Sequence, residues 1–495
     1  MATQSPTRPL ALRWLAAASL LAVGLVGGCG SSDDSPQPEP RATWYQDVAP
    51  MLSAHCNGCH AQGGIGPFPL NDYDTAKAHA AQMLAEVDRG AMPPFDARED
   101  ADCTPRFGWV DDPRLSAEQK ATLHNWVEDG FALGEVAEIP PPRSVELPNI
   151  SKTMTPVEGF AASGERDQFV CYILDPEVTA PITWLTGLQV RPDIAEVVHH
   201  AVISESLAGP ELDQLIALRG IGKPFDCGTA TAPSNFVVHI WTPGNQPMQT
   251  QPEIAVPILA GAKLVMQVHY HAAGRTHAPD KTAVDLQFSS VWPRKMYFVA
   301  AAGNIGQAPA LLPGPGDTAG PEFRVPAGSP DHPEHMRITL PALGGAAADP
   351  RIFSVNPHMH LVGTHISATL ERPAARGNDP QQECLANGAW NFDWQRTYTY
   401  DTPLDNLPSV AAGDILDIKC KFDNTISNPF VQRMLKDSNL PPTPIDVRLG
   451  EQTTDEMCLE IFGVAINAPA RPALDAPVVM PDMTGFGLNP NLFAR

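Results

Sequence analysis

Proline constrains this chain more than any other residue. It supplies 52 of the 495 residues, roughly twice its usual share in a globular protein. Each proline lacks a backbone donor and ends or kinks a helix interior. Hydrophobic residues still make up 43% of the sequence, which is enough to form cores. We therefore expect packed domains built from short elements, with few long helices.

The region after about residue 145 has the pattern of short β-strands. Proline and glycine separate runs rich in Val, Ile, Tyr and Phe, as in FVCYIL, VVHHAVI, KLVMQVHYH, DILDIKCKF and EIFGVAI. Several such runs with turn residues between them indicate antiparallel β-sandwiches. The segment LLPGPGDTAGP divides the region. It predicts two β domains, at 139–310 and 331–480, with a joint at 311–330 and a tail at 481–495.

Residues 1–29 have the parts of a secretion signal: a polar start with two arginines, an apolar run from Trp14 to Val26, and small residues before Cys29. With the polar spacer at 30–42, they resemble a bacterial lipoprotein signal, which implies lipidation of Cys29. Ordinary cleavage nearby is the alternative. No later stretch reaches about 18 uninterrupted apolar residues. We expect an exported protein of the periplasm or cell envelope that touches the membrane only through a lipid anchor.

The charge balance excludes one class of partner. The chain has 33 Lys and Arg against 56 Asp and Glu, which gives a formal charge of −23. A surface this acidic repels the phosphate backbone of nucleic acids. We expect no nucleic-acid partner.

Residues 43–138 show helical patterns, and they contain the motif Cys56-Asn57-Gly58-Cys59-His60. This is the C-x-x-C-H pattern of covalent c-type haem attachment, in which both cysteines form thioethers and the histidine ligates iron. A zinc site made of Cys56, Cys59, His60 and Cys103 is the alternative. No second C-x-x-C pair supports zinc, so we expect one covalent haem.

A haem of this kind needs a second axial ligand, and methionine is a common one. Met92 lies in RGAMPP, where the prolines force an extended loop that can hold a thioether over the haem. Met83 lies within a predicted helix and suits the core better. We therefore favour Met92. With these features, residues 43–138 resemble a small all-α class I cytochrome c.

Three histidine motifs lie in the β-rich region. In His358-Met359-His360 and in His269-Tyr270-His271, the period of two along a strand puts both histidines on one face. The adjacent pair His199-His200 can reach one metal only at a bulge or a strand end. Surface or core histidines are the alternative for each motif taken singly. Together they favour a metal, and imidazole suits zinc, copper, nickel or iron.

The order of motifs is more specific than any one of them. EVVHHAVI, WTPG, VMQVHYH, NPHMHLVGTH and TTDEMCLEIFGV follow one another across about residues 145–480. In this order they resemble the copper type II, ascorbate-dependent monooxygenases, the family of dopamine beta-monooxygenase and peptidylglycine alpha-hydroxylating monooxygenase. The resemblance implies two antiparallel β jelly-roll domains with one copper ion each. It implies an electron-storing copper bound by His199, His200 and His269. It also implies an oxygen-activating, catalytic copper bound by His358, His360 and Met457.

The same resemblance implies two disulfides, Cys171–Cys227 and Cys420–Cys458. It leaves Cys103 and Cys384, which could bridge two domains, although six cysteines allow 15 pairings in all. Whether His271 replaces or supports His269 also stays open.

Some positions depart from the family. In its peptide-amidating branch, an arginine, an asparagine and a tyrosine grip the substrate carboxylate, and Asn356, Leu459 and Ile461 stand at those positions here. Peptide amidation is therefore not expected.

We expect an exported haem- and copper-containing monooxygenase that hydroxylates a C–H bond of a small organic substrate with O2. A redox donor would reduce the haem. Electrons would then pass to the first copper and on to the second. The alternative is a non-catalytic periplasmic electron-transfer or copper-binding lipoprotein. A copper-dependent reductase is a weaker third hypothesis.

Overall fold

The structure is a computed structural model. It describes residues 40–472 apart from short gaps at 63–65, 143–145, 165–166, 229–235, 244, 273, 305–309, 346 and 451. The expected signal at 1–29 with Cys29, most of the spacer at 30–42 and the tail at 481–495 lie outside the described residues. Among the helices it describes, none is long and apolar enough to cross a bilayer.

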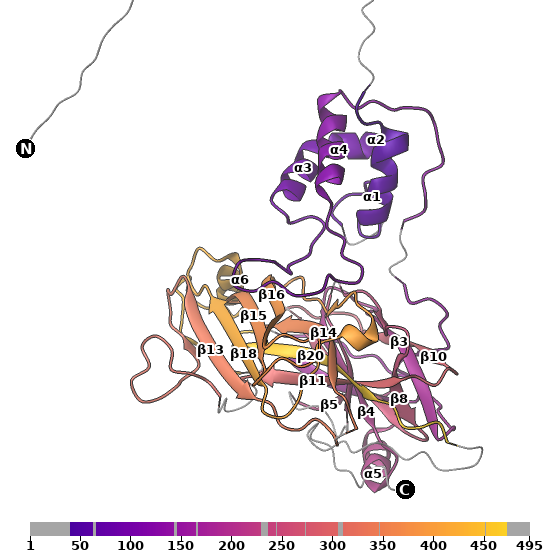
Figure 1. The fold of residues 1–495 in the computed structure, drawn as a ribbon, viewed down its shortest axis with the longest axis vertical. Helices are drawn as coiled ribbons and strands as arrows, with labels where there is room; N and C mark the ends of the chain where they lie inside the picture. Colours follow the sequence, from indigo (N-terminus) through magenta and orange to yellow (C-terminus); the bar gives the residue numbers. More distant parts are fainter. Residues whose placement is uncertain are drawn as a thin grey trace, which may run out of the picture.

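A small helical part comes first in the chain and sits above the β-sheets in Figure 1. Its helices pack around a core of their own that contains Trp44, Leu52 and Trp126. Ser116 caps the last helix through a reciprocal bond pattern with Gln119, which satisfies two of its free backbone donors. The helices are η1 (Trp44–Val48), α1 (Ala49–His55), α2 (Tyr73–Ala78), α3 (Ala80–Asp88) and α4 (Ala117–Glu128).

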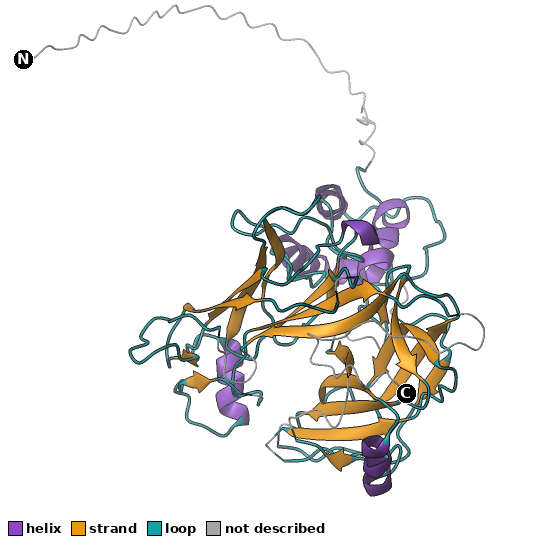
Figure 2. Ribbon diagram, turned by 60° about the horizontal axis from the view of Figure 1, so that its bottom comes forward, coloured by secondary structure: helices purple, strands orange, loops and turns teal. Residues whose placement is uncertain are grey.

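Strands dominate the chain after the helical part, as the proline-broken runs predict, and Figure 2 shows helices only at the margins of the sheets. The elements up to residue 303, which we call the first β half, are β1 (Lys152–Met154), β2 (Gln168–Leu174), β3 (Ile182–Arg191), β4 (Val198–Ser206), α5 (Pro210–Arg219), β5 (Phe225–Asp226), β6 (Phe236–Trp241), β7 (Met248–Gln249), β8 (Ile254–Leu259), β9 (Lys263–Tyr270), β10 (Ala283–Ser289) and β11 (Lys295–Gly303).

The second β half begins after the Pro/Gly-rich joint. Its elements are β12 (Arg324–Val325), β13 (His332–Thr339), β14 (Arg351–His358), β15 (Gly363–Glu371), β16 (Gln382–Ala389), β17 (Tyr398–Thr399), η2 (Leu404–Asn406), β18 (Ile415–Phe422), α6 (Pro429–Asp437), β19 (Val447–Arg448) and β20 (Leu459–Asn467).

These strands form packed sheets. A nine-stranded sheet runs β1-β10-β3-β8-β11-β20-β14-β17, with β7 on β3. The others run β5-β2-β9-β4-β6, β13-β18-β15-β16 and β12-β19. One continuous core holds side chains from all of these sheets, among them Tyr172, Leu185, Val325, Ile418 and Phe462. The predicted β-sandwich architecture is confirmed.

The largest sheet crosses the boundary expected between the two β domains. β11 pairs with β20 along its whole length, from Lys295 opposite Asn467 to Gly303 opposite Leu459. The other edge of β11 pairs in parallel with β8. A boundary at residues 310–311 separates two strands that share a ladder of main-chain hydrogen bonds. The two halves are therefore joined through one sheet, and β11 pairs across the predicted boundary.

Three disulfides are formed among the described residues. Cys171–Cys227 and Cys420–Cys458 are both present, as predicted. Cys103 and Cys384, which the sequence left open, form the third. Disulfides persist in oxidising compartments outside the cytoplasm. This pattern supports the expected location.

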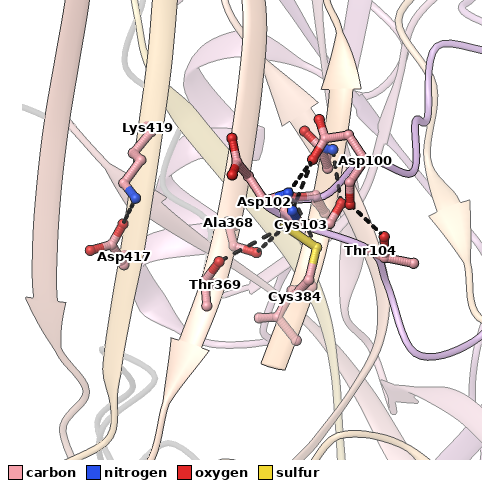
Figure 3. Close-up of a disulfide and its surroundings, with 12 residues drawn as sticks. Asp100, Asp102, Cys103, Thr104, Ala368, Thr369, Cys384, Asp417 and Lys419 are labelled. Atoms are coloured by element: carbon pink, nitrogen blue, oxygen red, sulfur yellow. Dashed lines mark hydrogen bonds and ion pairs between the residues drawn. A yellow bond between two sulfur atoms is a disulfide. The ribbon is translucent and has the colours of Figure 1, made fainter. Parts of the chain in front are cut away.

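The third disulfide fastens the loop between α3 and α4 to the second β half. We call residues 95–112 of this loop the docking strap. Figure 3 shows Cys103 joined to Cys384, with the backbone N–H groups of Asp102 and Cys103 donating to Asp100 at 2.9 Å. The strap adds bridge pairs to the β half at Ala97 with Gly388 and at Trp109 with Tyr400.

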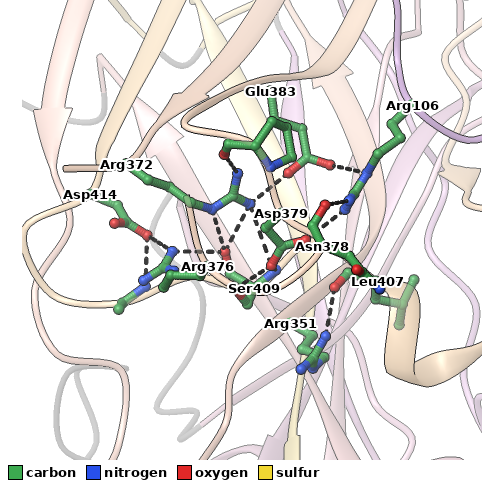
Figure 4. A network of polar contacts seen from close by, with 12 residues as sticks. Arg106, Arg351, Arg372, Arg376, Asn378, Asp379, Glu383, Leu407, Ser409 and Asp414 are labelled. Carbon is green, nitrogen blue, oxygen red and sulfur yellow. Dashed lines mark hydrogen bonds and ion pairs between the residues drawn. The ribbon is translucent and has the colours of Figure 1, made fainter. Parts of the chain in front are cut away.

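An ionic network beside the disulfide holds the strap as well (Figure 4). The Arg106 guanidinium lies 2.7 Å from Asp379 and 2.8 Å from Glu383. Arg372 lies 2.6 Å from the other oxygen of Glu383. The strap thus belongs to the core of the second β half, although the sequence assigned all of 43–138 to one helical domain.

Candidate metal centre

The first histidine group lies where β4 and β9 pair. His200 is directly opposite His269, so their side chains leave the same face of the sheet. The register shifts between Val198 and His200, which marks a β-bulge. The bulge lets the side chain of His199 turn to the face of the sheet on which the side chain of His200 lies. This is the irregularity that the adjacent histidines require.

The three rings meet at their Nδ1 atoms. Nδ1 of His200 lies 3.1 Å from that of His199 and 3.3 Å from that of His269. One ligand atom from each ring lies within 4.8 Å of the others. Two nitrogens bound tetrahedrally to one ion at about 2.0 Å are about 3.3 Å apart. The rings are therefore spaced as ligands of a single metal ion.

The surroundings keep two of these rings, His199 and His200, uncharged. Burial lowers the pKa of His199 and of His200 well below its usual value, and the neighbouring His269 lowers both further. A neutral imidazole offers a lone pair to a metal, whereas a protonated ring has none to offer. The trio of His199, His200 and His269 fits a metal that prefers nitrogen donors.

Asp167 supports the trio from behind. Its Oδ2 lies 3.2 Å from Nε2 of His269, the ring atom away from the Nδ1 meeting point, and it accepts the backbone N–H of Thr453 at 3.1 Å. A carboxylate in this place fixes the orientation of a ligand imidazole. Asp167 Oδ1 lies 2.7 Å from Nδ1 of His271, and this hydrogen bond raises the pKa of His271. His271 thus contacts the carboxylate behind His269 and lies outside the group of three rings.

The second histidine group lies at the end of β14. The rings of His358 and His360 have centroids 5.3 Å apart and planes at 85°. Met359 between them is fully buried in the hydrophobic core. The two histidines therefore leave the opposite side of the chain, as the H-x-H spacing predicts.

Hydrogen bonds occupy Nδ1 of both rings. Nδ1 of His358 lies 3.2 Å from Oε1 of Gln395, and Nδ1 of His360 lies 3.1 Å from the carbonyl oxygen of Asp455. Since both partners are acceptors, each Nδ1 carries the proton and each Nε2 keeps its lone pair. Burial lowers the pKa of His358 to about 4 and that of His360 to about 3. Both rings are neutral at physiological pH and can bind a metal.

Met457 is brought to this pair by strand register. β20 pairs with β14 so that Leu459 lies opposite His358. Two residues beyond that pair, the same antiparallel register would place Met457 opposite His360. The Met457 side chain is only 5% exposed. The following Cys458 is bonded to Cys420, which fixes the start of β20 against β18.

Glu456 ties His360 to Met457. Its Oε1 accepts the backbone N–H groups of both residues, that of Met457 at 2.7 Å. Its Oε2 accepts the N–H of Val362 at 3.1 Å. Burial raises the pKa of Glu456 to about 8. Sequence reasoning missed this residue, because Glu456 follows the polar residues Thr454 and Asp455 and no spacing rule singles it out.

One loop between β16 and β17 contacts both histidine groups. We call residues 390–396 the connecting loop. The indole N–H of Trp390 donates to the carbonyl oxygen of His360 at 2.8 Å. The ring of Phe392 stacks on His199, and Gln395 bonds His358. No motif or periodicity in the sequence pointed to this loop.

A cavity of about 1000 Å³ adjoins the first group. Asp167, His199 and His271 line it from the first β half. Phe392, Arg433 and Met434 line it from the second. Its size and mixed lining suit a small organic molecule.

The C-x-x-C-H motif follows the end of α1. The backbone N–H of Cys59 and that of His60 donate to the carbonyl oxygen of Cys56 at 3.1 and 2.9 Å. Nδ1 of His60 lies 2.9 Å from the carbonyl oxygen of Phe68, which leaves its Nε2 for a metal. Cys56 and Cys59 are free thiols. This arrangement fits thioether attachment of a haem with His60 on the iron.

Burial raises the pKa of Cys56 to about 12 and also raises that of Cys59, where the charge of Arg396 in the connecting loop opposes the effect. Of the two methionines considered, Met83 is buried in the helical core, whereas Met92 is 37% exposed after the end of α3. Met92 is therefore the more exposed of the two candidates.

No family model and no curated protein matches this chain. The solved major capsid protein P2 from bacteriophage PM2 is 10% identical, with 64% of this chain and 97% of that chain covered and a TM-score of 0.26. A peptide-N(4)-(N-acetyl-β-D-glucosaminyl) asparagine amidase is 9% identical, with 67% and 98% covered and a TM-score of 0.27. Neither likeness bears on the histidine groups.

Proposed function

We propose that this protein is an exported copper- and haem-dependent monooxygenase that hydroxylates a C–H bond of a small organic substrate with O2. The observation that carries the proposal is the presence of two groups of half-buried or buried imidazoles, joined by one connecting loop at the junction of the β halves. Imidazole with a methionine thioether is a donor set that suits copper. The ordered motifs that resemble the copper monooxygenases support the same conclusion.

His199, His200 and His269 would hold one copper ion. Their Nδ1 spacing of 3.1 and 3.3 Å suits one ion. Asp167 would keep the His269 ring in place when the charge of the ion changes, because its carboxylate contacts Nε2, the ring nitrogen on the side away from the ion.

His358, His360 and Met457 would hold the second copper ion. A thioether donor favours the reduced ion, the state that reacts with O2. Bound copper supplies the one-electron chemistry through which O2 attacks a C–H bond. Glu456 fixes His360 and Met457 relative to each other, and the buried setting limits access of water to this centre.

The substrate would occupy the cavity that both β halves line. Phe392 and Met434 offer it apolar contact, and Arg433 lies 2.8 Å from Asp393 at the same wall. Asn356, at the position of the carboxylate-binding arginine of peptide-amidating enzymes, donates its side-chain N–H to Thr397 at 2.9 Å. With no cation at that position, a peptide C-terminus would lack the partner that the arginine provides in those enzymes.

Cys56, Cys59 and His60 would hold a c-type haem, with Met92 as the second axial ligand, so the helical part would be a class I cytochrome c domain. Cys29 would carry the lipid that anchors the exported chain. The haem would receive electrons from an external redox donor one at a time.

Metal and haem analysis of protein exported to the periplasm tests the proposal. We expect one covalent haem by pyridine-haemochrome spectroscopy and two copper ions per chain. We also expect transfer of isotopically labelled oxygen from O2 into an organic product. Zinc in the C-x-x-C-H motif, or histidine groups that bind no copper, would contradict the proposal. Copper and haem without oxygen transfer would identify an electron carrier instead.

A further inference from the structure

We propose that electrons from the helical part enter the copper pair at the His358/His360/Met457 centre, through Phe95, Arg396 and Gln395. The sequence-based expectation had them enter through His199, His200 and His269. This inference rests on the proposed function and concerns the route by which its electrons arrive.

The route begins at Met92. Two prolines separate Met92 from Phe95, which is the first residue of the docking strap. The ring of Phe95 contacts Tyr398 edge-on, with centroids 5.1 Å apart. The guanidinium of Arg396 lies 5.3 Å from the centroid of the same ring. The loop that carries the expected axial ligand therefore ends in contact with the second β half.

The next step runs along the chain. Arg396 is bonded covalently to Gln395, whose side-chain Oε1 lies 3.2 Å from Nδ1 of His358. Gln395 is 2% exposed, and its side-chain N–H donates to the carbonyl oxygen of Phe392 at 3.2 Å. Its own carbonyl oxygen accepts the hydroxyl of Thr242 at 3.0 Å. Gln395 is thus held rigidly between the strap and a ligand of the second centre.

The route to the trio is less direct. From Gln395 an electron would pass through a further hydrogen bond to Phe392 and then across a stacking contact of 4.5 Å between the rings of Phe392 and His199. Electron transfer slows with each gap that covalent bonds do not span. The path to His358 has one hydrogen bond after Arg396, whereas the path to His199 has a hydrogen bond and a through-space jump.

One electron moves in each event. A ferrous haem iron becomes ferric, and a cupric ion held by His358, His360 and Met457 becomes cuprous. No proton is transferred, and the reductant of the haem is the external redox donor.

The test follows haem oxidation in two variants of the full chain, each lacking one centre. His199→Ala/His200→Ala removes the first and His358→Ala/His360→Ala removes the second. The haem is reduced anaerobically with Cu(II) in place, and haem absorbance and the Cu(II) EPR signal are recorded together. We expect the first variant to keep the wild-type rate of haem oxidation and the second to lose its fast phase. The reverse result overturns the inference.

Three further substitutions separate the routes within the connecting loop. Gln395→Leu should slow haem oxidation several-fold. Gln395→Glu, which keeps an acceptor for Nδ1 of His358, should restore it. Phe392→Leu should leave the rate of haem oxidation unchanged. If Phe392→Leu slows haem oxidation and Gln395→Leu does not, the inference is overturned. Copper and haem contents are measured for every variant. Wild-type protein without these cofactors would overturn the proposed function itself, whereas a loaded protein with the other route would overturn only this inference.

Discussion

The imidazole of His199 stacks on the phenyl ring of Phe392, with centroids 4.5 Å apart and planes at 24°. His199 belongs to the first β half and Phe392 to the second. Thr453 of the second half also donates its backbone N–H to Asp167 behind the trio. The first histidine group and the carboxylate behind it are thus contacted by residues of both halves.

Met457→Ile should remove copper from the second centre and leave the first loaded. The substitution takes away the thioether that favours the reduced ion but keeps an apolar side chain at a 5% exposed position. We expect copper to fall from two ions per chain to one and oxygen transfer to be lost, by metal analysis and O2 uptake. Met359→Ile is the matched control, because Met359 is buried between the two histidines on the other side of the chain. Equal copper loss in both variants would contradict a ligand role for Met457.

Asp167→Asn should weaken copper binding by the trio about 10- to 100-fold, the usual effect of losing a carboxylate behind a ligand histidine. Asp167 Oδ2 lies 3.2 Å from Nε2 of His269. An amide side chain has no negative charge, so it would hold that ring less firmly. A competition titration with a copper chelator measures the change. Asp213→Asn on exposed α5 should bind copper as the wild type does. An unaltered affinity in Asp167→Asn would show that Asp167 has no part in the site.

Cys103→Ser/Cys384→Ser should lower the free energy of unfolding by about 2–4 kcal/mol, the usual effect of removing a native disulfide. This bond closes a loop across 281 residues. The Arg106 contacts to Asp379 and Glu383 remain, so the strap should still dock in the folded protein. Thermal unfolding of the two forms gives the difference. A variant as stable as the wild type would mean that the ionic network alone secures the strap.

Glu205→Gln should stabilise the protein at and above neutral pH. Glu205 is fully buried, accepts the backbone N–H of Leu259 at 2.9 Å, and has its pKa raised by burial to about 8. Below the ordinary carboxyl pKa, both folded and unfolded chains hold the proton. As the pH rises from the ordinary carboxyl pKa to 8, the unfolded chain loses the proton of Glu205 first. The free energy of unfolding therefore falls by up to about 1.4 kcal/mol per pH unit. Glutamine keeps the acceptor and cannot ionise.

Melting temperatures recorded between pH 5 and 8 check this prediction. The gap between Glu205→Gln and the wild type should widen as pH rises. Glu211→Gln, at an exposed position of α5, should give no such gap. Parallel pH curves for Glu205→Gln and the wild type would contradict it.

Features of the site that depend on local spacing could be predicted from the sequence. The H-x-H period put His358 and His360 on one side with Met359 in the core, and the adjacent His199 and His200 required the bulge now seen in β4. Strand geometry decides such relationships within a few residues. The sequence is therefore informative wherever the determinant lies within one element.

Supporting residues could not be predicted in this way. Asp167 reaches His269 from a loop about a hundred positions away in the chain, and Gln395 reaches His358 from a different loop. Their places depend on how the sheets pack, and no periodicity encodes that. The acidic Glu456 was visible but had no spacing rule to single it out.

Long-range pairing also explains where the domain boundaries moved. Phe95, Ala97 and Trp109 lie in a segment that follows helical patterns, yet their partners are in the second β half. The pairing of β11 with β20 joins segments more than 150 positions apart. Proline-rich joints show where a chain can bend, but not which of its strands will meet afterwards.

The bond between Cys103 and Cys384 has a kinetic consequence. The helical part and the second β half already belong to one chain, and the disulfide shortens the tether between them, which raises the effective concentration of each at the surface of the other. Any exchange between them is a first-order process. Its rate should be the same at low and at high protein concentration.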